Sequence, residues 1–265
     1  MRIIPIVLFL LSTILPGYSQ FSLPDSLSAK IESTNDEAEK IKSLDAYCLS
    51  LLRSDLPKAK YFIDSAIRMA ERSENTYLKH ELLNTKGSYF FYRNMVDSSI
   101  KYYQKNRRYY ENIDSIEKLM HSYNNIATSY LQFNNSDSSI KYGEKALAIA
   151  KKLSDSETLS KIYSDLSGSY LNKDNYSNAW FFLNKAEDFL NSDDHFDQAV
   201  VNIRKGIIYF QLDDSVKSLK AYQKALMHNN KNHRADFRQS IYNNLGRFYE
   251  VLKKDLDSAL YFYRK

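Results

Sequence analysis

Apolar positions recur along most of the chain at intervals of three and four residues, which is the period of one face of an α-helix. Ile126, Tyr130 and Phe133 form one such run. The chain holds only 6 glycines and 4 prolines, and no proline lies beyond Pro57. Because proline breaks helices, the proline-free remainder permits a chain that is helical throughout. The pattern therefore predicts an all-α fold.

The helical pattern itself repeats. The six letters DSSIKY stand at residues 97–102 and again at 137–142, 40 residues later. Weaker copies of the surrounding segment place a small residue at the same point, at intervals of 40, 40, 40, 39 and 41: Ala59, Ser99, Ser139, Ala179, Ser218 and Ala259. Upstream, another small residue precedes an aromatic by three positions: Gly87, Ala127, Ser167, Gly206 and Gly246 precede Phe90, Tyr130, Tyr170, Tyr209 and Tyr249. Small-then-large spacing lets two helix backbones approach, so each unit is predicted to hold two amphipathic helices.

Short oxygen-bearing side chains are expected to cap these helices, because they can accept from the first unpaired backbone N–H groups. The predicted caps of the second helices are Asp97-Ser98, Asp137-Ser138, Ser177, Asp214-Ser215 and Asp257-Ser258. For the first helices, "DSIE" at 114–117 and "SDSE" at 154–157 match the capping-box pattern.

A single helix pair cannot bury its apolar faces, but stacked pairs can, and a repeat of this length is typical of helical solenoids. The aligned pattern resembles the tetratricopeptide repeat. Its first-helix signature is matched by "YNNLGRFY", at Tyr242, Leu245, Gly246 and Tyr249. The resemblance covers about residues 35 to 265 and implies a right-handed superhelical solenoid of antiparallel helix pairs. Units here exceed the family's ~34 residues and lack its closing proline, which suggests a long-repeat variant.

The first residues have the pattern of an export signal. Arg2 precedes an apolar core of 13 residues, Ile3–Leu15, and then come Pro16 and the small residues Gly17 and Ser19. This predicts a signal peptide over residues 1–19, cleaved after Ser19, and an exported, periplasmic or cell-envelope protein. The core is shorter than the ~20 residues that span a bilayer, although an uncleaved membrane anchor stays an alternative. Residues 20–33 are then a linker, and 34–265 hold about six helix pairs, the last incomplete.

Charge and cysteine content narrow the function classes. The chain carries 37 Lys+Arg against 32 Asp+Glu, a net charge of +5, without the basic stripe that a nucleic-acid binder usually shows. The segment "KYYQKNRRYY" at 101–110 could stack on single-stranded nucleic acid, but packing of its tyrosines against neighbouring helices is favoured.

Cys48 is the single cysteine and cannot form an internal disulfide. Its apolar context predicts a buried structural thiol rather than a reactive one.

Motifs for catalysis or metal binding are missing from the sequence. No two of the five histidines (His80, His121, His195, His228 and His233) have the i, i+4 spacing of a helical zinc site. Asp193, Asp194, His195 and Asp197 could suggest a metal, but a cap for the following helix is favoured. We therefore expect no enzyme activity, no cofactor and no metal. An enzyme that uses the repeats as its scaffold is a disfavoured alternative.

The resemblance implies that the first helices line the inner wall of the superhelix and bind a peptide or protein there. Asparagine offers one acceptor and two donors, so a ladder of asparagines could hold an extended peptide backbone; ordinary surface polarity is the alternative. The candidate binding residues are Asn84, Asn124, Asn125, Lys161, Asp165, Arg204, Asn243, Asn244 and Arg247.

The resemblance also implies a broader role. Exported arrays of this kind often serve as the sensor part of a signalling protein, so we expect a peptide- or protein-binding scaffold. The alternative is a membrane-anchored cytoplasmic regulator.

The last unit stops within its second helix, which leaves Ala259, Leu260, Phe262 and Tyr263 uncovered. Because a solenoid end needs a polar cap, we expect either a fragment of a longer protein or self-association through this end.

Overall fold

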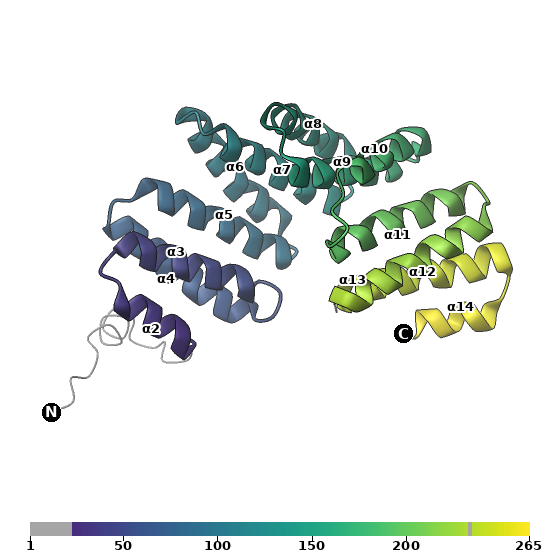
Figure 1. Ribbon diagram of the computed structural model, residues 1–265, viewed down its shortest axis with the longest axis horizontal. Coiled ribbons are helices and arrows are strands. Elements are labelled where there is room, and N and C mark those ends of the chain that lie inside the picture. The colour runs from purple at the N-terminus through teal and green to yellow at the C-terminus, as the bar shows by residue number, and fades with distance from the viewer. Residues whose placement is uncertain (1–22, 233–234) are drawn as a thin grey trace. The chain divides into compact units, whose positions relative to one another are not determined.

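The computed structural model describes residues 23–232 and 235–265, and these form helices with no strand among them (Figure 1). This confirms the predicted all-α solenoid of helix pairs. The predicted signal peptide, with its cleavage after Ser19, lies outside the described residues. The chain divides after Ile113 into two compact units.

The first unit contains two helix pairs and a short preceding helix. Its helices are α2 (Asp25–Ser33), α3 (Glu37–Leu51), α4 (Leu56–Arg72), α5 (Thr76–Tyr92) and α6 (Val96–Asn112). Buried Ile41, Phe62 and Leu82 lie in one core shared by α3, α4 and α5. The segment predicted as a linker contains α2, because Leu27 and Ile31 lie one turn apart and pack onto that core.

The second unit contains the remaining four pairs. Its helices are α7 (Ile116–Gln132), α8 (Ser136–Leu153), α9 (Ser156–Leu171), α10 (Tyr176–Asp188), α11 (His195–Gln211), α12 (Ser215–Asn232), α13 (Ala235–Phe248), the π-helical turn η1 (Tyr249–Lys253) and α14 (Leu256–Tyr263). The first helices α7, α9, α11 and α13 contact one another in turn, whereas the described parts of the second helices make no comparable contacts. The first helices therefore form the inner layer of this unit.

The small positions are the points where paired helices touch, as predicted. A Cβ added at Gly206 would lie 2.4 Å from the ring of Tyr222, and one at Gly87 would lie 2.6 Å from Tyr103. In three units the small residue on the first helix also faces the small residue twelve positions later. The Ser139 hydroxyl donates to the Ala127 carbonyl at 2.9 Å, and the Ser218 hydroxyl donates to that of Gly206 at the same distance. The close approach thus satisfies the serine hydroxyls inside the core.

In four of the five aligned units the aromatic that follows the small position stacks on the second helix, whereas Tyr209 meets Trp180 of the preceding pair edge-to-face. Phe90 stacks on Tyr102 with ring centroids 5.3 Å apart, and Tyr170 stacks on Phe182 at the same separation. These partners are twelve residues apart, whereas Tyr249 stacks on Phe262, thirteen residues later. The π-helical turn η1 inserts the extra residue. This accounts for the single repeat interval of 41.

The turns explain why the closing proline of the family is dispensable here. Non-glycine residues with left-handed backbones recur at the helix ends, at intervals of 20 residues over much of the chain: Glu74, Asn94, Asp114, Asn134, Ser154 and Asp174, followed by Asp213 and Lys254. Asparagine and aspartate tolerate this conformation better than most residues. The helices therefore end through these residues rather than through proline or glycine.

The predicted helix caps need correction. The caps of α8, α10 and α14 are Asn135, Asn175 and Asp255, each two residues before the predicted position. The N-cap residue of α6 is Met95, which forms no side-chain cap bond. Asp137 and Asp257 instead lie in the first turn, where a negative charge complements the helix dipole. Among the predicted caps of the second helices, only Asp214 is correct, and it accepts from the Lys217 N–H at 3.0 Å. The predicted capping boxes also fail: Ser154 ends α8 in the left-handed region, and Ser115 forms no cap bond.

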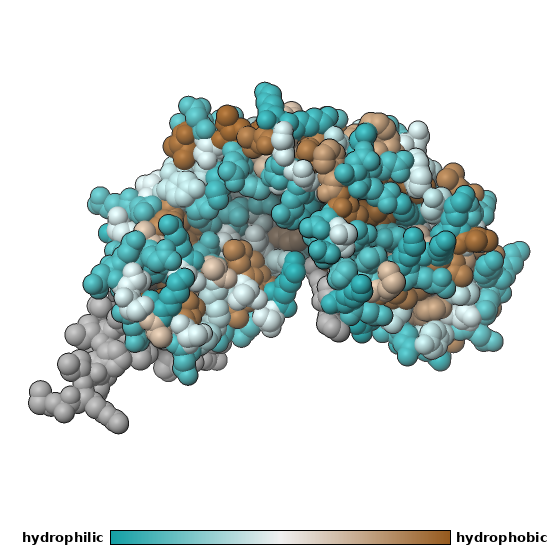
Figure 2. All heavy atoms as spheres, viewed as in Figure 1, coloured by the Kyte–Doolittle hydropathy of each residue, from teal (hydrophilic) through white to brown (hydrophobic). Residues whose placement is uncertain are grey.

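The described part of the chain contains no helix that combines the length and apolar character required to cross a membrane. On the face drawn in Figure 2, hydrophobic residues form separate patches among hydrophilic ones. Scattered exposed apolar residues of this kind are normal for a folded surface.

Candidate functional site

The candidate residues lie on the first helices, as predicted, but in both units. Asn84 is on α5 of the first unit. The others are on the inner layer of the second unit: Asn124 and Asn125 on α7, Lys161 and Asp165 on α9, Arg204 on α11, and Asn243, Asn244 and Arg247 on α13.

Arg204 joins three of these helices through a polar network. Its guanidinium lies against Gly168 of α9, where an added Cβ would come within 2.9 Å of Nη2. Nη2 donates to Asp165 Oδ1 at 3.3 Å, and Nη1 donates to the Ser164 hydroxyl. The other oxygen of Asp165 accepts from the Thr128 hydroxyl of α7 at 2.7 Å. The side chain of Arg204 is 13% exposed, so Asp165 supplies the opposite charge that a buried guanidinium needs.

The electrostatics of this network are mixed. Burial lowers the pKa of Arg204, and the Asp165 carboxylate acts in the opposite direction. Two turns closer to the start of α11, burial and the neighbouring Asp194 raise the pKa of Asp197 to about 6. Burial lowers the pKa of Lys161, but its ion pair with Glu157 at 2.5 Å outweighs this and leaves the pKa raised. The inner face of α9 and α11 therefore alternates acids and bases and carries no single strong charge.

A groove of about 380 Å³ opens beside Arg204. Along α11, Val200, Ile203, Arg204, Ile207 and Gln211 recur at three and four residues, so one stripe of this helix forms the floor. The other lining residues come from α7, α9, the turn after α9, the first residue of α10 and α13: Leu131, Gly168, Leu171, Asn172, Asp174, Tyr176, Phe237, Ser240 and Arg247. An apolar floor with a few polar groups is typical of a ligand-binding groove.

Arg247 lies at the rim of this groove and differs from Arg204. It is exposed, and its guanidinium carbon is 5.2 Å from the centre of the Phe210 ring. None of the ion pairs among the described residues involves Arg247. Its positive charge acts to lower the pKa of nearby Tyr176, but the hydrogen bond to Asp174 has the larger effect and leaves that pKa raised. Arg247 therefore presents its donors to the groove without a carboxylate partner.

The structure brings Arg204 and Arg247 to one groove, and the candidate asparagines do not line it. Asn244 donates to the Ser240 carbonyl of its own helix at 2.9 Å, and exposed Asn243 accepts from Gln239 at 3.2 Å. Asn124 keeps a buried Oδ1 without a hydrogen-bond partner among the described residues. The asparagine ladder stays a prediction.

Sequence reasoning missed most of the groove lining. Val200, Ile203 and Ile207 recur at the spacing of residues that face a buried core. Only Arg204, which lies within this stripe, could have indicated that the stripe borders a surface groove. The favoured interpretation of the aspartates before α11 is confirmed, because Asp194 accepts from the backbone N–H of Phe196 and of Asp197 at 3.0 Å. In the part of the chain that the structure describes, no three metal-ligating side chains gather into a possible site.

Comparison with known proteins supports the repeat. Residues 121–153 match the tetratricopeptide repeat family. No curated protein is similar in sequence. A STAND ATPase with a tetratricopeptide repeat sensor from Pyrococcus horikoshii is similar over 90% of this chain at 17% identity, with a TM-score of 0.62, and the chain spans only 38% of its length.

Two Rap proteins have a similar fold. Apo RapI is 14% identical over 89% of this chain and 85% of its own, with a TM-score of 0.70. A Rap protein in complex with competence and sporulation factor is 14% identical over 91% of this chain and 77% of its own, with a TM-score of 0.68. At these identities the likeness establishes the tetratricopeptide-like fold.

Proposed function

We propose that this chain is an exported scaffold that binds a protein or peptide in the groove between α9, α11 and α13. The ligand segment is apolar and carries a carboxylate that meets Arg247. Support comes from neighbours of the same fold: one Rap structure holds competence and sporulation factor, and the STAND ATPase uses its repeats as a sensor. A sensor role in the cell envelope, with residues 1–19 removed on export, completes the proposal.

One observation carries the proposed ligand chemistry. Of the two arginines in the groove, Arg204 is neutralised by Asp165, while Arg247 is exposed and unpaired among the described ion pairs. Charge-assisted hydrogen bonds from arginine to a carboxylate are strong and directional. The apolar floor beside Arg247 would bury aliphatic or aromatic side chains of the same ligand, which favours a peptide over an ion or a sugar.

The proposal is tested by selecting ligands from a displayed library of random peptides on the folded chain. We expect the selected peptides to combine apolar residues with Asp, Glu or a free C-terminal carboxylate. Arg247→Glu should weaken binding of a selected peptide by at least about tenfold, because a hydrogen bond to a charged group contributes about 1.5–3 kcal/mol. Lys220→Glu makes the same charge change at an exposed site on α12, outside the inner layer, and should leave binding unaltered.

The asparagine ladder is tested with the same peptide. Asn125→Ala together with Asn244→Ala should weaken binding by about an order of magnitude if each asparagine contributes about 0.5–1.5 kcal/mol.

Equal affinity for wild type and Arg247→Glu would contradict the groove as the binding site. A selection that yields no peptide would contradict the peptide-binding function itself.

A further inference from the structure

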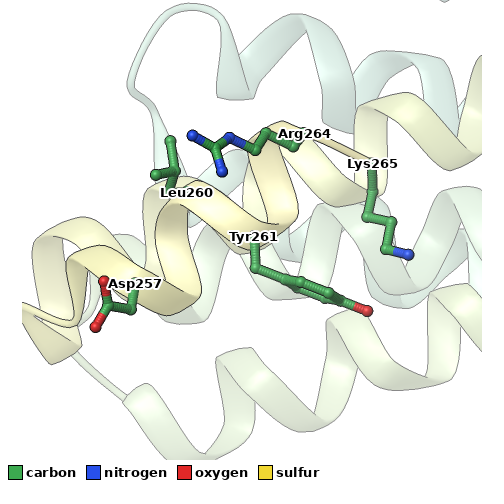
Figure 3. A pocket seen from close by; sticks show the side chains of 5 residues that line it. All are labelled: Asp257, Leu260, Tyr261, Arg264 and Lys265. Atoms are coloured by element: carbon green, nitrogen blue, oxygen red, sulfur yellow. The ribbon is translucent and has the colours of Figure 1, made fainter.

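Lysine recurs at two positions of the second helices. These positions lie two and six residues after the small residue of each second helix, so they are four residues apart and share one helical face. The first position holds Tyr61, Lys101, Lys141, Phe181, Lys220 and Tyr261. The second position holds Ser65, Lys105, Lys145, Lys185, Lys224 and Lys265. Figure 3 shows Tyr261 and Lys265 on α14, where they line a shallow depression of about 440 Å³ with Asp257, Leu260 and Arg264.

In the second unit, the second helices α8, α10 and α12 lie outside the inner layer, and we call these three helices the outer layer. The outer layer contains nine lysines, no arginine and four acidic residues. Its net charge is therefore +5, equal to that of the entire chain, whereas the inner helices α7, α9, α11 and α13 together carry +1. Helix α12 alone has four lysines and no acidic residue. The positive excess of the second unit is thus concentrated on its outer layer.

The charge on α12 is not neutralised locally. Lys220 and Lys224 are exposed and take part in none of the ion pairs among the described residues. Like charges four residues apart on a helix are destabilising. Burial lowers the pKa of His228, one turn after Lys224, and His195, Lys231 and Lys224 act in the same direction. The outer face of α12 therefore carries an uncompensated positive potential.

Exposed apolar side chains lie among these lysines. On α10, Phe181 takes the position that Lys220 has on α12, and it is 54% exposed. On α12, Val216 and Met227 share a stripe with Lys220 and Lys224, at intervals of four, four and three residues. Val216 is 76% exposed and Met227 is 50% exposed. The outer layer therefore combines flexible cations with protruding apolar groups.

This combination favours a lipid surface over a protein or a nucleic acid. Arginine is the residue of choice where a carboxylate or a nucleic-acid phosphate is held in a fixed geometry, and the outer layer contains none. Lysine is a compact charge on a flexible stem, which suits a fluid layer of anionic headgroups. Apolar side chains beside the lysines can enter the boundary between headgroups and acyl chains.

We propose that the outer layer of the second unit docks on the surface of a membrane that contains anionic phospholipid. Lys141, Lys145, Lys220 and Lys224 meet the headgroup phosphates, and Phe181 enters the interface beside them. The contact is peripheral and holds the chain at the membrane without crossing it. None of these residues lines the α9–α11–α13 groove, so the membrane contact and the proposed ligand site are tested separately.

The first test is co-sedimentation of the full chain with vesicles of phosphatidylcholine, with and without phosphatidylglycerol. Wild type should bind only the anionic vesicles, and high salt should release most of it, because salt screens exposed charges. Lys220→Glu together with Lys224→Glu should weaken binding at least about tenfold, since each lysine near an anionic surface contributes a roughly fivefold change. Circular dichroism would verify that each variant is folded.

A matched control makes the same charge change elsewhere in the second unit. Lys253 and Lys254 are exposed, but they lie on η1 and in the turn that follows it, outside the outer layer. Lys253→Glu together with Lys254→Glu should leave vesicle binding close to that of wild type.

A fluorescent reporter locates the contact. Trp180 is the only tryptophan of the chain, so Phe181→Trp in a Trp180→Phe background places a single indole on the exposed face of α10. On anionic vesicles, emission from this indole should shift to shorter wavelength and be quenched by brominated phosphatidylglycerol. Trp180 in the parent chain is partly buried against a hydrophobic core and should respond less.

Several results would overturn the proposal. Wild type that ignores anionic vesicles at low salt would show that the outer layer does not dock on lipid. Equal losses for the two charge-reversal pairs would assign the binding to net charge rather than to this layer. An unchanged emission from the indole at position 181, or tighter binding to single-stranded DNA than to the vesicles, would contradict the membrane as the partner.

Discussion

Alanine substitution of single glycines tests whether the small positions hold the helix pairs together. Gly143, Gly206 and Gly246 all lie in the helices of the second unit, so their variants share one context. At Gly206, an added Cβ would lie 2.4 Å from the ring of Tyr222, which is 1% exposed and has no room to move. At Gly143, the nearest atom would be a methyl group of Leu166 at 3.0 Å, which would have to move by only a few tenths of an ångström.

The structure assigns a different free-energy change to each site. Alanine in a helix gains about 1 kcal/mol over glycine, and overpacking a core costs about 1–3 kcal/mol. Gly206→Ala should therefore lose up to about 2 kcal/mol of stability, whereas Gly143→Ala should be neutral or slightly stabilising. Gly246→Ala should fall between them, because the ring that it meets, Tyr263, is 42% exposed and can rotate away.

Chemical denaturation followed by circular dichroism would measure the three variants beside the wild type. Because stacked repeats need not unfold in a single step, hydrogen exchange of α11 and α12 provides the local measurement for Gly206→Ala. Equal stability of Gly206→Ala and Gly143→Ala would refute the assignment of close helix contacts to the small positions.

Three further predictions concern charge, thiol reactivity and processing. The pKa of Asp197 is raised to about 6, so the folded chain favours its protonated form. The stability that this form contributes is lost as the pH rises from about 4 to 6, where the carboxyl ionises. Asp197→Asn should therefore raise the free energy of unfolding above pH 6 by about 1 kcal/mol, after allowance for solvent screening, and leave it unchanged below pH 4. The buried Cys48 thiol, whose pKa burial raises, should react with a thiol reagent only after unfolding; rapid reaction of the native chain would contradict this. Mass spectrometry of the exported protein should find a chain that begins at Gln20, and a chain that retains Met1 would support the anchor alternative instead.

The repeat was predictable because its physical causes are local and recur. Small residues and aromatics at fixed spacing reflect the same helix contact in each unit, as Gly87 against Tyr103 and Gly206 against Tyr222 show. The caps were not predictable to the residue. Each turn offers several Asn, Asp and Ser side chains within a few positions, and the left-handed residue that precedes the cap decides which one is used, as Asn134 does for Asn135.

The groove could be predicted only in part. Arg204 and Arg247 were candidates because they are polar residues on first helices, but nothing in the sequence indicates that Arg204 pairs with Asp165, 39 residues earlier. The apolar floor has the same periodicity as a buried core, and Ile203 is indeed only 6% exposed. Whether such a stripe is covered by another helix or borders a groove depends on how neighbouring units pack, which a single sequence does not reveal.

Hydrogen exchange of the chain with and without a library-selected peptide tests the central claim most directly, because it locates the ligand without altering any residue. The account predicts slower exchange in α11 and α13, around the stripe that ends at Gln211 and the turn that carries Arg247, and no change in α12. Protection confined to the second helices or to the first unit, or no protection at saturating peptide, would contradict it.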